Sequence, residues 1–507
     1  MLELMNRGAA RLRPFRGAVA GLRFFLLFFV AAIAGAATRT DSTPNIVIIL
    51  ADDLGYGDLG SFGSTTIRTP HLDRLAKEGR RFTSFVTASS VCSPSRAALL
   101  TGSFPKRVGM HQGVLFPGST TGLNPAEHTI ADHLKQQGYA TACFGKWHLG
   151  HHPEVLPTAN GFDNYYGIPY SNDMNHPDNQ DKPKGGPAGM DALWADPAST
   201  LTKWKTPLMK NETIVELPVD QRTITRRCTD RGVAFIKENQ KRPFFLYLPY
   251  SMPHIPLYVP DDVRDPDLRR AYINTVEHID TEVGRVFDTL RKLDLAKNTY
   301  VIFTSDNGPW LPYKHHGGSA GPLRDGKMST FEGGQRVPCI MWAPGRIPAG
   351  TESNGLASTI DLLPTIAAIT GRPLPAGRAI DGVDISPLLN GDGSSPRNEF
   401  LYYTRNGRIE GIREGDWKLL VKQPERQGQL DPSAKADVML FNLADDLGEK
   451  DNRAAAKPDI VERLRQRMLA QDAAIEAAAR PIWKKPGAGG VVQPAAAPPS
   501  KFRKPNP

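Results

Sequence analysis

The stretch Asn45-Ile-Val-Ile-Ile-Leu-Ala-Asp-Asp-Leu-Gly-Tyr-Gly57 decides the fold of this chain of 507 residues. It opens with an apolar run rich in β-branched residues, which is typical of a strand buried on both faces of a parallel sheet. Two aspartates and a glycine-containing turn follow at once. Ligands of open α/β sheets bind beyond the carboxyl ends of the strands, so the stretch predicts a buried strand with a functional site at its end.

The same pattern of short apolar runs separated by amphipathic stretches recurs along the chain. This alternation predicts an α/β fold with a mixed, mostly parallel sheet flanked by helices. The predicted strands are residues 45–50, 140–144, 244–248, 300–304 and 337–342, and the predicted helices are residues 125–137, 221–239, 267–293 and 359–369.

The pattern changes after the Gly/Ser/Pro-rich loop at residues 389–396. Short strand patterns then predict an antiparallel sheet, which a final helix closes. The predicted strands are residues 400–404, 408–413 and 417–421, and the predicted helix is residues 460–479. We therefore expect a large α/β domain over residues 37–390, a small α+β domain over residues 391–480, and a disordered, basic Pro/Ala-rich tail over residues 481–507.

Residues 1–36 predict an export signal. An arginine-rich start precedes an apolar run at residues 24–33 and the small residues Ala34-Gly35-Ala36, which are typical of a cleavage site. The run is short for a membrane span, although an uncleaved anchor stays open as an alternative. We expect export to a periplasmic, secreted or lysosome-like compartment.

The formal net charge of +9 belongs to the two ends of the chain. Five arginines precede residue 36 and five lysines or arginines follow residue 481, so residues 37–480 are close to neutral. Nucleic-acid binding needs basic charge on the folded body, and we therefore predict no nucleic-acid partner. Any membrane contact would come from an uncleaved signal or from the basic tail.

Polar side chains follow four of the predicted strands and should meet at one edge of the sheet. In chain order they are Asp52 and Asp53, Lys146 and His148, His254, and Asp306 and Asn307. The aspartates and the asparagine form an all-oxygen set, which suits Ca²⁺ or Mg²⁺, whereas Zn²⁺ prefers imidazole or thiolate. Either acidic pair alone is more often a helix cap or a turn. Two such pairs, each following a strand, favour a metal site.

The motif Cys92-Ser-Pro-Ser-Arg96, followed by Ala-Ala-Leu-Leu-Thr-Gly102, predicts the start of a helix with proline in its first turn. The helix amides would then face an anion, although a lone cysteine is more often a small buried thiol. The whole motif resembles the signature of the type I sulfatases, whose cysteine is oxidised after synthesis to formylglycine. Gly145-Lys-Trp-His-Leu-Gly150 resembles the second signature of that family.

The resemblance extends from residue 45 to about residue 452 and is strongest to members like arylsulfatase A and N-acetylgalactosamine-6-sulfatase. It implies an alkaline-phosphatase-like fold and an enzyme that hydrolyses sulfate esters, either aryl sulfates or sulfated sugars, to an alcohol and inorganic sulfate. It also implies one Ca²⁺ ion that polarises the sulfate, with these ligands: Asp52, Asp53, residue 92 as formylglycine, Asp306 and Asn307.

The resemblance further implies roles for the remaining residues. One hydroxyl of the hydrated aldehyde at Cys92 would attack sulfur with help from Asp306, while His254 and Lys327 assist departure of the alcohol oxygen. His148 would then take the proton of the second hydroxyl, and sulfate would be eliminated. Cations must offset the charge on the sulfate oxygens. The implied cations are Arg96, Lys146 and Lys327, and the candidate substrate contacts are Ser171, Asn172 and Asp173.

Two alternatives stay open. A phosphodiesterase or phosphonate hydrolase of the same superfamily would use a similar metal site on a phosphoryl group. A catalytically inactive binder of sulfated glycans would keep the pocket and leave Cys92 unmodified. The sulfatase hypothesis requires a further partner, a formylglycine-generating enzyme.

Overall fold

The computed structural model describes residues 43–174, 185–200, 204–391, 394–426, 429–431 and 433–487. All of them belong to one compact unit, Arg39–Pro507. The predicted export signal at residues 1–36 lies outside the described residues. Among the described helices, none combines the length and the apolar character that crossing a bilayer requires.

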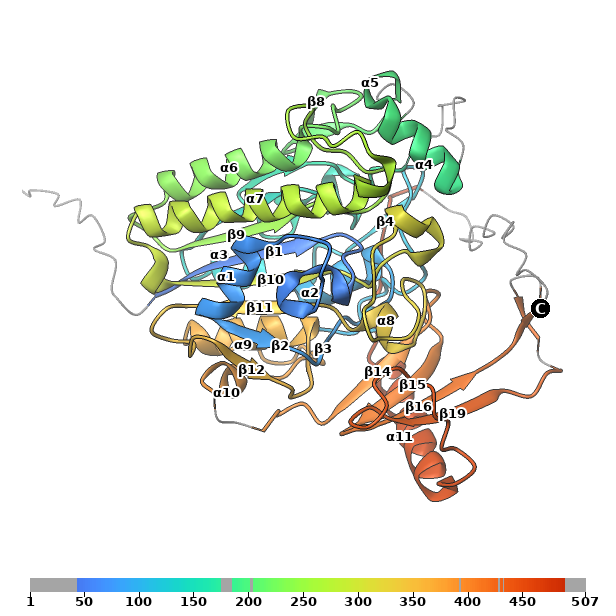
Figure 1. Cartoon of the computed structure of the whole chain (residues 1–507). Coiled ribbons are helices and arrows are strands. Elements are labelled where there is room, and N and C mark those ends of the chain that lie inside the picture. The colour runs from blue at the N-terminus through green and yellow to red at the C-terminus, as the bar shows by residue number, and fades with distance from the viewer. Residues whose placement is uncertain are drawn as a thin grey trace, which may run out of the picture. The chain divides into compact units, whose positions relative to one another are not determined.

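The described residues form a main sheet of ten strands in the order β12-β2-β11-β10-β1-β9-β5-β6-β7-β8 (Figure 1). The strands are β1 (Asn45–Ala51), β2 (Arg80–Phe82), β5 (Ala140–Phe144), β6 (Asn164–Gly167), β7 (Leu208–Lys210), β8 (Thr213–Glu216), β9 (Phe244–Pro249), β10 (Thr299–Ser305), β11 (Cys339–Trp342) and β12 (Thr351–Ser353). Every residue of β1 is buried. The buried strand predicted from the opening stretch is thus confirmed. It lies near the centre of the sheet.

The centre of the sheet is parallel and its margins are partly antiparallel. Strand β1 pairs in parallel with both neighbours, with Ile48 opposite Ile302 of β10 and Tyr247 of β9. Strands β5 and β6 continue the parallel set, whereas β11 runs antiparallel to β10. The prediction of a mixed, mostly parallel sheet is therefore confirmed.

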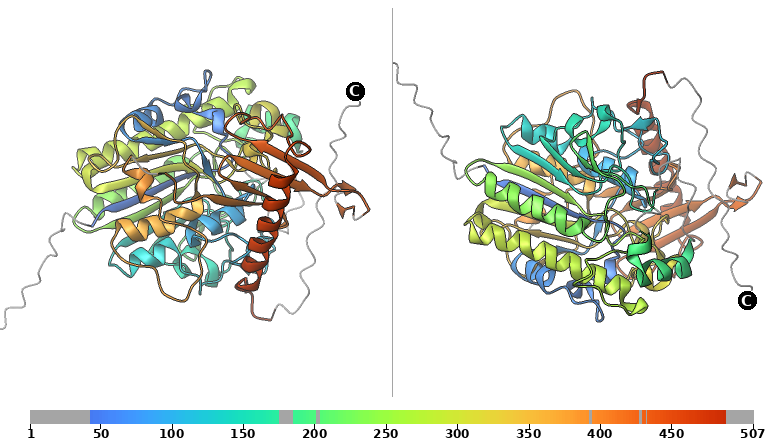
Figure 2. Two further views of the ribbon diagram at one scale, coloured as in Figure 1. Left: turned by 90° about the horizontal axis from the view of Figure 1, so that it is seen from below. Right: turned by 90° about the horizontal axis from the view of Figure 1, so that it is seen from above.

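Helices cover both faces of this sheet (Figures 1 and 2). Because side chains alternate along a strand, Val47 and Ile49 of β1 enter one apolar cluster while Ile46 and Ile48 enter another. The first cluster includes residues of α1 (Pro70–Glu78), α6 (Ile224–Glu238) and α7 (Ala271–Lys292), and the second includes residues of α2 (Cys92–Thr101), α3 (Ile130–Lys135) and α9 (Leu362–Ile369). One strand thus joins two helical layers.

The predicted helix at residues 125–137 is shorter in the structure. Helix α3 starts only after Thr129, whose hydroxyl accepts from the backbone of Asp132, while the Asp132 carboxylate accepts from the backbone of Thr129. This reciprocal cap fixes the start of the helix. Shorter helices also belong to the part of the fold built around the main sheet. They are α4 (Gly186–Ala195), α5 (Pro197–Thr200), α8 (Glu332–Gln335), α10 (Ser386–Leu389) and the 3₁₀ helix η8 (Leu311–His316).

A second, antiparallel sheet follows in the order β14-β15-β16-β19. Its strands are β14 (Glu399–Tyr403), β15 (Ile409–Glu414), β16 (Trp417–Lys422) and β19 (Asp437–Asn442), with α11 (Pro458–Ala477) packed beside them. The sequence predicted three of these strands; β19 was missed because residues 423–436 separate it from β16. Phe400 and Leu464 share an apolar cluster with Ala98 and Phe104, so the two sheet layers pack together.

Small two-stranded pairs complete the fold. They are β3 (Phe85–Val86) with β13 (Ala357–Ser358), β4 (Thr121–Gly122) with β20 (Trp483–Lys484), and β17 (Glu425–Arg426) with β18 (Gln429–Leu430). Strand β20 falls in the predicted tail. Residues 481–487 are thus ordered, because β20 pairs with β4 and Ile482 packs on the main core. Residues 488–507 lie outside the described residues.

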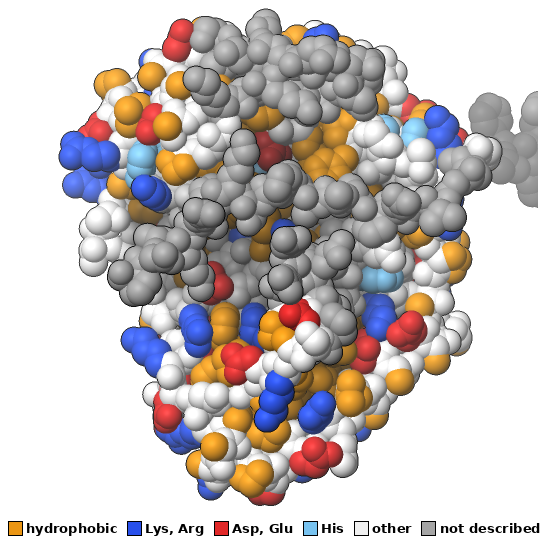
Figure 3. Space-filling model, turned by 90° about the vertical axis from the view of Figure 1, so that its right-hand side faces the viewer, with side chains coloured by type: hydrophobic (Ala, Val, Ile, Leu, Met, Phe, Trp, Pro, Cys, Tyr) orange, Lys and Arg blue, Asp and Glu red, His pale blue; other side chains and the backbone are white. Residues whose placement is uncertain are grey.

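Basic and acidic side chains are interspersed among hydrophobic ones on the face of the molecule shown in Figure 3.

Candidate active site

The carboxyl ends of four adjacent strands, β10, β1, β9 and β5, build the candidate site. We call this edge of the sheet, together with the start of α2, the rim. The sequence predicted that polar residues directly after these strands would meet at one edge of the sheet, and each strand end does supply polar residues to the rim. The side chains are buried: Asp52, Asp53, Cys92, Arg96, Lys146, His148, His254, Asp306 and Asn307 are each at most 3% exposed.

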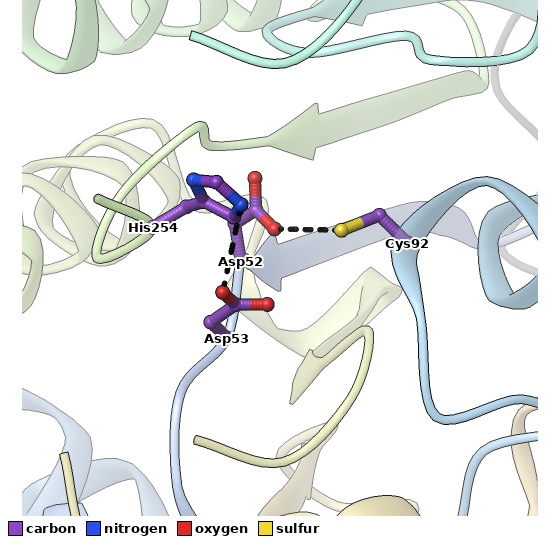
Figure 4. A group of neighbouring side chains, drawn as sticks. All are labelled: Asp52, Asp53, Cys92 and His254. Carbon is purple, nitrogen blue, oxygen red and sulfur yellow. Dashed lines mark hydrogen bonds and ion pairs between the residues drawn. The ribbon is translucent and has the colours of Figure 1, made fainter. Parts of the chain in front are cut away.

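Four of these side chains point toward one another in Figure 4: Asp52, Asp53, Cys92 and His254. The sulfur of Cys92 lies 3.5 Å from Asp52 Oδ1, and His254 Nε2 lies 3.6 Å from Asp53 Oδ2. Their ligand atoms all lie within 4.8 Å of one another. Cys92 is the first residue of α2, so the free backbone amides of that helix start beside the cluster.

Two lysines bind the two aspartates. Lys146 Nζ donates to Asp52 Oδ2 at 2.6 Å, and Lys327 Nζ donates to Asp53 Oδ2 at 2.7 Å. Burial alone would raise the pKa of Asp52, but Lys146 and Arg96 outweigh it and hold that pKa well below its usual value. Burial would lower the pKa of Lys327, but Asp53 outweighs it and raises that pKa. The rim therefore holds fixed charges of both signs.

Arg96 links the ends of β1 and β10 from below. Its Nε lies 2.9 Å from Asp306 Oδ2, its second nitrogen NH2 lies 3.5 Å from Asp52 Oδ2, and its NH1 donates to the Lys146 carbonyl at 2.7 Å. Its Nε and NH1 thus make hydrogen bonds, whereas the buried NH2 has ion-pair contacts with Asp52 and Asp306 but no hydrogen bond among the described residues. This arrangement orients the rim carboxylates and adds positive charge beneath them.

The thiol of Cys92 is a weak nucleophile in this environment. Burial raises its pKa well above the usual value, although Lys146 and Lys327 act in the opposite direction. Since the thiolate is the reactive form of cysteine, the protonated thiol has little reactivity of its own.

The oxygen atoms of the rim fit a hard cation. Asn307 Nδ2 donates to Asp53 Oδ1 at 2.7 Å, and the buried Asn307 Oδ1 has no hydrogen-bond partner among the described residues. Burial and the nearby Asp52 raise the pKa of Asp306 to about 6, against the influence of Arg96. Crowded carboxylates and an unpaired amide oxygen are what a Ca²⁺ ion would satisfy.

The metal-binding group found by geometry differs from the predicted ligand set. Among histidine, cysteine and carboxylate side chains it contains His254, which the sequence placed beside the leaving group, and it omits Asp306. A thiol and an imidazole suit softer ions such as Zn²⁺. The all-oxygen set is the better match to Ca²⁺ once residue 92 carries oxygen in place of sulfur.

The two rim histidines are held in different hydrogen-bonded states. His148 Nε2 lies 2.9 Å from the Leu115 carbonyl, which can only accept, so Nε2 carries the proton and the buried Nδ1 holds a free lone pair. Burial, Lys146 and Arg96 lower the pKa of His148 well below its usual value. His148 is therefore a neutral base.

His254 Nδ1 donates to the Ile255 carbonyl at 2.5 Å, which leaves Nε2 facing Asp53. Burial and Lys327 lower the pKa of His254, while Asp53 opposes them. An anionic substrate beside the ring would favour its protonated form.

The segment proposed for substrate contacts also reaches the rim. Ser171 Oγ accepts from Lys146 Nζ at 3.0 Å. Asn172 Nδ2 donates to the Pro256 carbonyl at 3.0 Å, so Asn172 braces the segment that carries His254. Asp173 acts to raise the pKa of His254. Of the three, Ser171 lies nearest to the cations of the rim.

Sequence reasoning did not place Leu115 in this site, and it named Trp310 only as a loop residue that could stack on a substrate ring or cover the core. The Trp310 ring lies 5.5 Å from the His254 ring and 4.3 Å from Lys327 Nζ. Such contacts place a flat apolar wall beside two of the proposed catalytic groups. A tryptophan following Asn307-Gly308-Pro309 was the available signal, whereas a backbone carbonyl such as that of Leu115 leaves no signal in the sequence.

Comparisons with known proteins agree with this geometry. A family model described as Sulfatase matches residues 44–372. Arylsulfatase G of Rattus norvegicus is 37% identical over 450 residues, covering 83% of this chain and 84% of that protein. Arylsulfatase A of Homo sapiens is 37% identical over 471 residues, covering 88% and 90%. The solved structure of Ps i-CgsB in complex with k-i-k-neocarrahexaose has a TM-score of 0.70 and 30% identity, and covers 85% of this chain and 93% of that one.

Proposed function

The chain belongs to the sulfatase family and hydrolyses sulfate esters, and we propose that it does so at the rim, through residue 92 as formylglycine and with one bound Ca²⁺ ion. The fold is alkaline-phosphatase-like, as in the solved sulfatases. The observation that carries the proposal is Cys92 at the start of α2, between Asp52 and Lys327. Neither phosphodiester hydrolysis nor glycan binding without turnover is favoured by these relatives.

The thiol of Cys92 must be replaced for this chemistry. A maturation enzyme would supply the oxidant, break the Cβ–Sγ bond and leave Cβ as an aldehyde. When hydrated, the aldehyde supplies one hydroxyl for attack on sulfur and a second that allows sulfate to leave without a separate hydrolytic step. Because Cys92 is only 1% exposed, we propose that maturation precedes closure of the fold.

The cations of the rim stabilise the anionic sulfate. Lys146 and Lys327 already bind the two carboxylates that face Cys92, so they need little reorganisation to meet the sulfate oxygens. Arg96 keeps Asp306 in place as the base for the first step. Lys327 and His254 stand beside the leaving alcohol oxygen, with Trp310 packed against both.

His148 serves the second half of the reaction. Its Nε2 is fixed by the Leu115 carbonyl, and its buried Nδ1 is free to accept a proton from residue 92. A neutral imidazole is the form that this step requires.

One Ca²⁺ ion would be held by Asp52, Asp53, Asp306, Asn307 and an oxygen of residue 92, and it would polarise the sulfate oxygens as a Lewis acid. The unpaired Asn307 Oδ1 and the raised pKa of Asp306 support this ligand set. Removing Ca²⁺ with a chelator should lower both the rate and the thermal midpoint, and adding Ca²⁺ back should restore them. An enzyme depleted of calcium by elemental analysis but fully active would contradict the ion's role.

The substrate class is an aryl sulfate or a sulfated sugar. The k-i-k-neocarrahexaose bound to Ps i-CgsB supports including oligosaccharides in any test panel. Trp310 and Tyr313, whose rings lie 4.8 Å apart, offer a surface on which a sugar or aryl ring can stack. We further propose that residues 37–390 form the catalytic domain and residues 391–480 a small C-terminal domain, and that the protein is exported by residues 1–36.

The decisive test is co-expression with a formylglycine-generating enzyme, followed by peptide mass spectrometry across Cys92 and assay on the substrate panel. We expect the aldehyde at residue 92 and release of inorganic sulfate. Cys92→Ala should abolish turnover and keep the circular dichroism spectrum and the thermal midpoint of the parent protein. Turnover by Cys92→Ala would overturn the assignment of the nucleophile. A protein whose Cys92 stays unmodified despite co-expression, and which binds sulfated glycans without releasing sulfate, would favour the binding protein instead.

A further inference from the structure

A second group of metal-ligating side chains lies outside the rim. It consists of Asp191 on α4 and of His315 and His316 at the end of η8. Their ligand atoms lie within 4.8 Å of one another. The aspartate and the histidines are more than 120 residues apart in the chain, at separations of 124 and 125, so the fold itself brings the three together.

All three side chains converge on one oxygen atom. His315 Nε2 lies 2.7 Å from Asp191 Oδ1, and His316 Nε2 lies 3.0 Å from the same oxygen. The two imidazole rings have centroids 4.5 Å apart. Zinc bound to nitrogen and oxygen at about 2.1 Å in a tetrahedron keeps its ligands about 3.4 Å apart. The three atoms would therefore need to move by less than about 1 Å to surround an ion.

Solvent can reach the group, while one ligand is fixed in the protein. The side chains of His315 and Asp191 are 33% and 29% exposed, whereas that of His316 is 1% exposed. The buried His316 is thus the fixed ligand, and Asp191 and His315 face solvent.

The chemistry of the ligands selects the kind of ion. Two imidazoles and one carboxylate suit a divalent transition metal, with water in the remaining position, and they do not suit Ca²⁺. We propose that Asp191, His315 and His316 bind one Zn²⁺-like ion, which fastens α4 to η8. Helix η8 starts directly after Trp310, the residue that packs on His254 and Lys327. The ion thus holds one wall of the rim in place and takes no part in the chemistry.

The test measures zinc uptake without substrate, so its outcome does not depend on the proposed function. Full-length protein saturated with Ca²⁺ is titrated with Zn²⁺ in equilibrium dialysis, and bound zinc is counted by mass spectrometry. Wild type should bind one zinc ion more than Asp191→Asn or His315→Gln, or bind it with affinity higher by about tenfold or more. Zinc should raise the thermal midpoint of wild type and leave that of both variants unchanged.

Two controls separate this group from other sites. His128→Gln alters the pair His128 and His133, whose ring nitrogens lie 3.3 Å apart. Among the described residues, this pair belongs to no metal-binding group with a carboxylate, so the variant should bind zinc like wild type. Repeating the comparison in a Cys92→Ala background removes the soft ligand of the rim, and the difference caused by Asp191→Asn should persist. Equal zinc uptake by wild type, Asp191→Asn and His315→Gln, or no uptake by wild type, would overturn the proposal.

Discussion

The ammonium group of Lys327 lies 3.6 Å from the sulfur of Cys92 while it donates a hydrogen bond of 2.7 Å to Asp53. It is thus fixed at the atom where the sulfate ester should react, and its positive charge is retained because Asp53 raises its pKa against the effect of burial. A fixed cation at this place stabilises charge that develops in the transition state and pays no cost of reorganisation at that moment.

Lys327→Met should therefore lower kcat by about 10²- to 10³-fold, the usual effect of deleting one preorganised donor. Lys327→Arg keeps the charge and should recover part of the loss. Steady-state kinetics on matured enzyme, with residue 92 checked by mass spectrometry in each variant, would measure both. A Lys327→Met enzyme with unchanged kcat would remove Lys327 from the reaction.

His148→Gln should slow the second half of the reaction and spare the first. Glutamine can still donate to the Leu115 carbonyl, but it has no basic nitrogen to replace the free Nδ1 of His148. Rapid-mixing experiments should show a burst of alcohol followed by slow turnover. His152→Gln is the matched control, because His152 Nε2 also contacts a carbonyl oxygen, that of Ser119 at 3.2 Å. Loss of the burst itself in His148→Gln would assign His148 to the first step.

His254→Ala should affect substrates according to their leaving groups. A sulfated sugar needs a proton on its departing oxygen, whereas an activated aryl sulfate does not. We expect kcat to fall by about 10²-fold or more on the sugar and clearly less on nitrophenyl sulfate. Equal losses on both substrates would mean that His254 acts on the sulfate or on Asp53, which lies 3.6 Å away, and not on the alcohol oxygen.

The parts of the site that sequence reasoning placed correctly are those where order along the chain determines position in space. Asp52 and Asp306 directly follow β1 and β10, which are neighbouring parallel strands, so the sheet alone brings them to one edge. Cys92 does not directly follow a strand of the main sheet, and its position at the rim was inferred from the resemblance of its motif to the sulfatase signature. The apolar strands were predicted within a few residues because burial on both faces leaves an unbroken hydrophobic run.

Contacts between distant loops could not be predicted in this way. Asp191 meets His315 and His316 across more than 120 residues, and no local pattern marks this pairing. Lys418 is a charged residue near the start of β16, yet its side chain is fully buried among carboxylates. Such pairings arise when whole layers of the fold pack together, and no local pattern in one sequence reveals which side chains will then meet.

Stability should depend on the ionisation of Asp58. Burial raises its pKa to about 6, even though Tyr272 and the backbone amides of Gly55 and Ser319 donate hydrogen bonds to it. The ordinary pKa of an aspartate carboxyl is 3.8, so the folded state binds this proton more tightly than the unfolded chain. The contribution to stability is therefore full below about pH 4 and is lost as the pH rises through about 6.

The measurement is the thermal midpoint of wild type minus that of Asp58→Asn between pH 4 and pH 7.5. The difference should fall as the pH rises, by an amount equivalent to roughly 3 kcal/mol for a shift of about two pKa units. Burial also raises the pKa of Asp280 to about 6, but Asp280 is present in both proteins and cancels in the difference. Parallel pH profiles for the two proteins would refute the raised pKa of Asp58.

A buried ion cluster connects the small sheet to the loop that carries Lys327. Lys418 Nζ of β16 lies 2.9 Å from Glu332 Oε1 and 2.9 Å from Glu449 Oε1, and all three side chains are fully buried. Burial would raise the pKa of Glu332, but Lys418 and the nearby Arg336 outweigh it and lower that pKa. Glu332 begins α8, five residues after Lys327, so Lys418 anchors the base of the loop that carries Lys327.

Lys418→Met should leave two carboxylates buried without their shared cation, at a cost of about 3–5 kcal/mol in the free energy of unfolding. It should also lower kcat, because the loop that positions Lys327 loses its anchor. Arg467→Met is the control on α11, beside the same sheet: its Nε lies 2.9 Å from Glu399 Oε1, its side chain is 55% exposed, and the expected cost is about 1 kcal/mol or less. If Lys418→Met does not fold, Lys418→Arg keeps the charge and tests the geometry. A Lys418→Met enzyme that retains both thermal midpoint and kcat would show that the small sheet does not position Lys327.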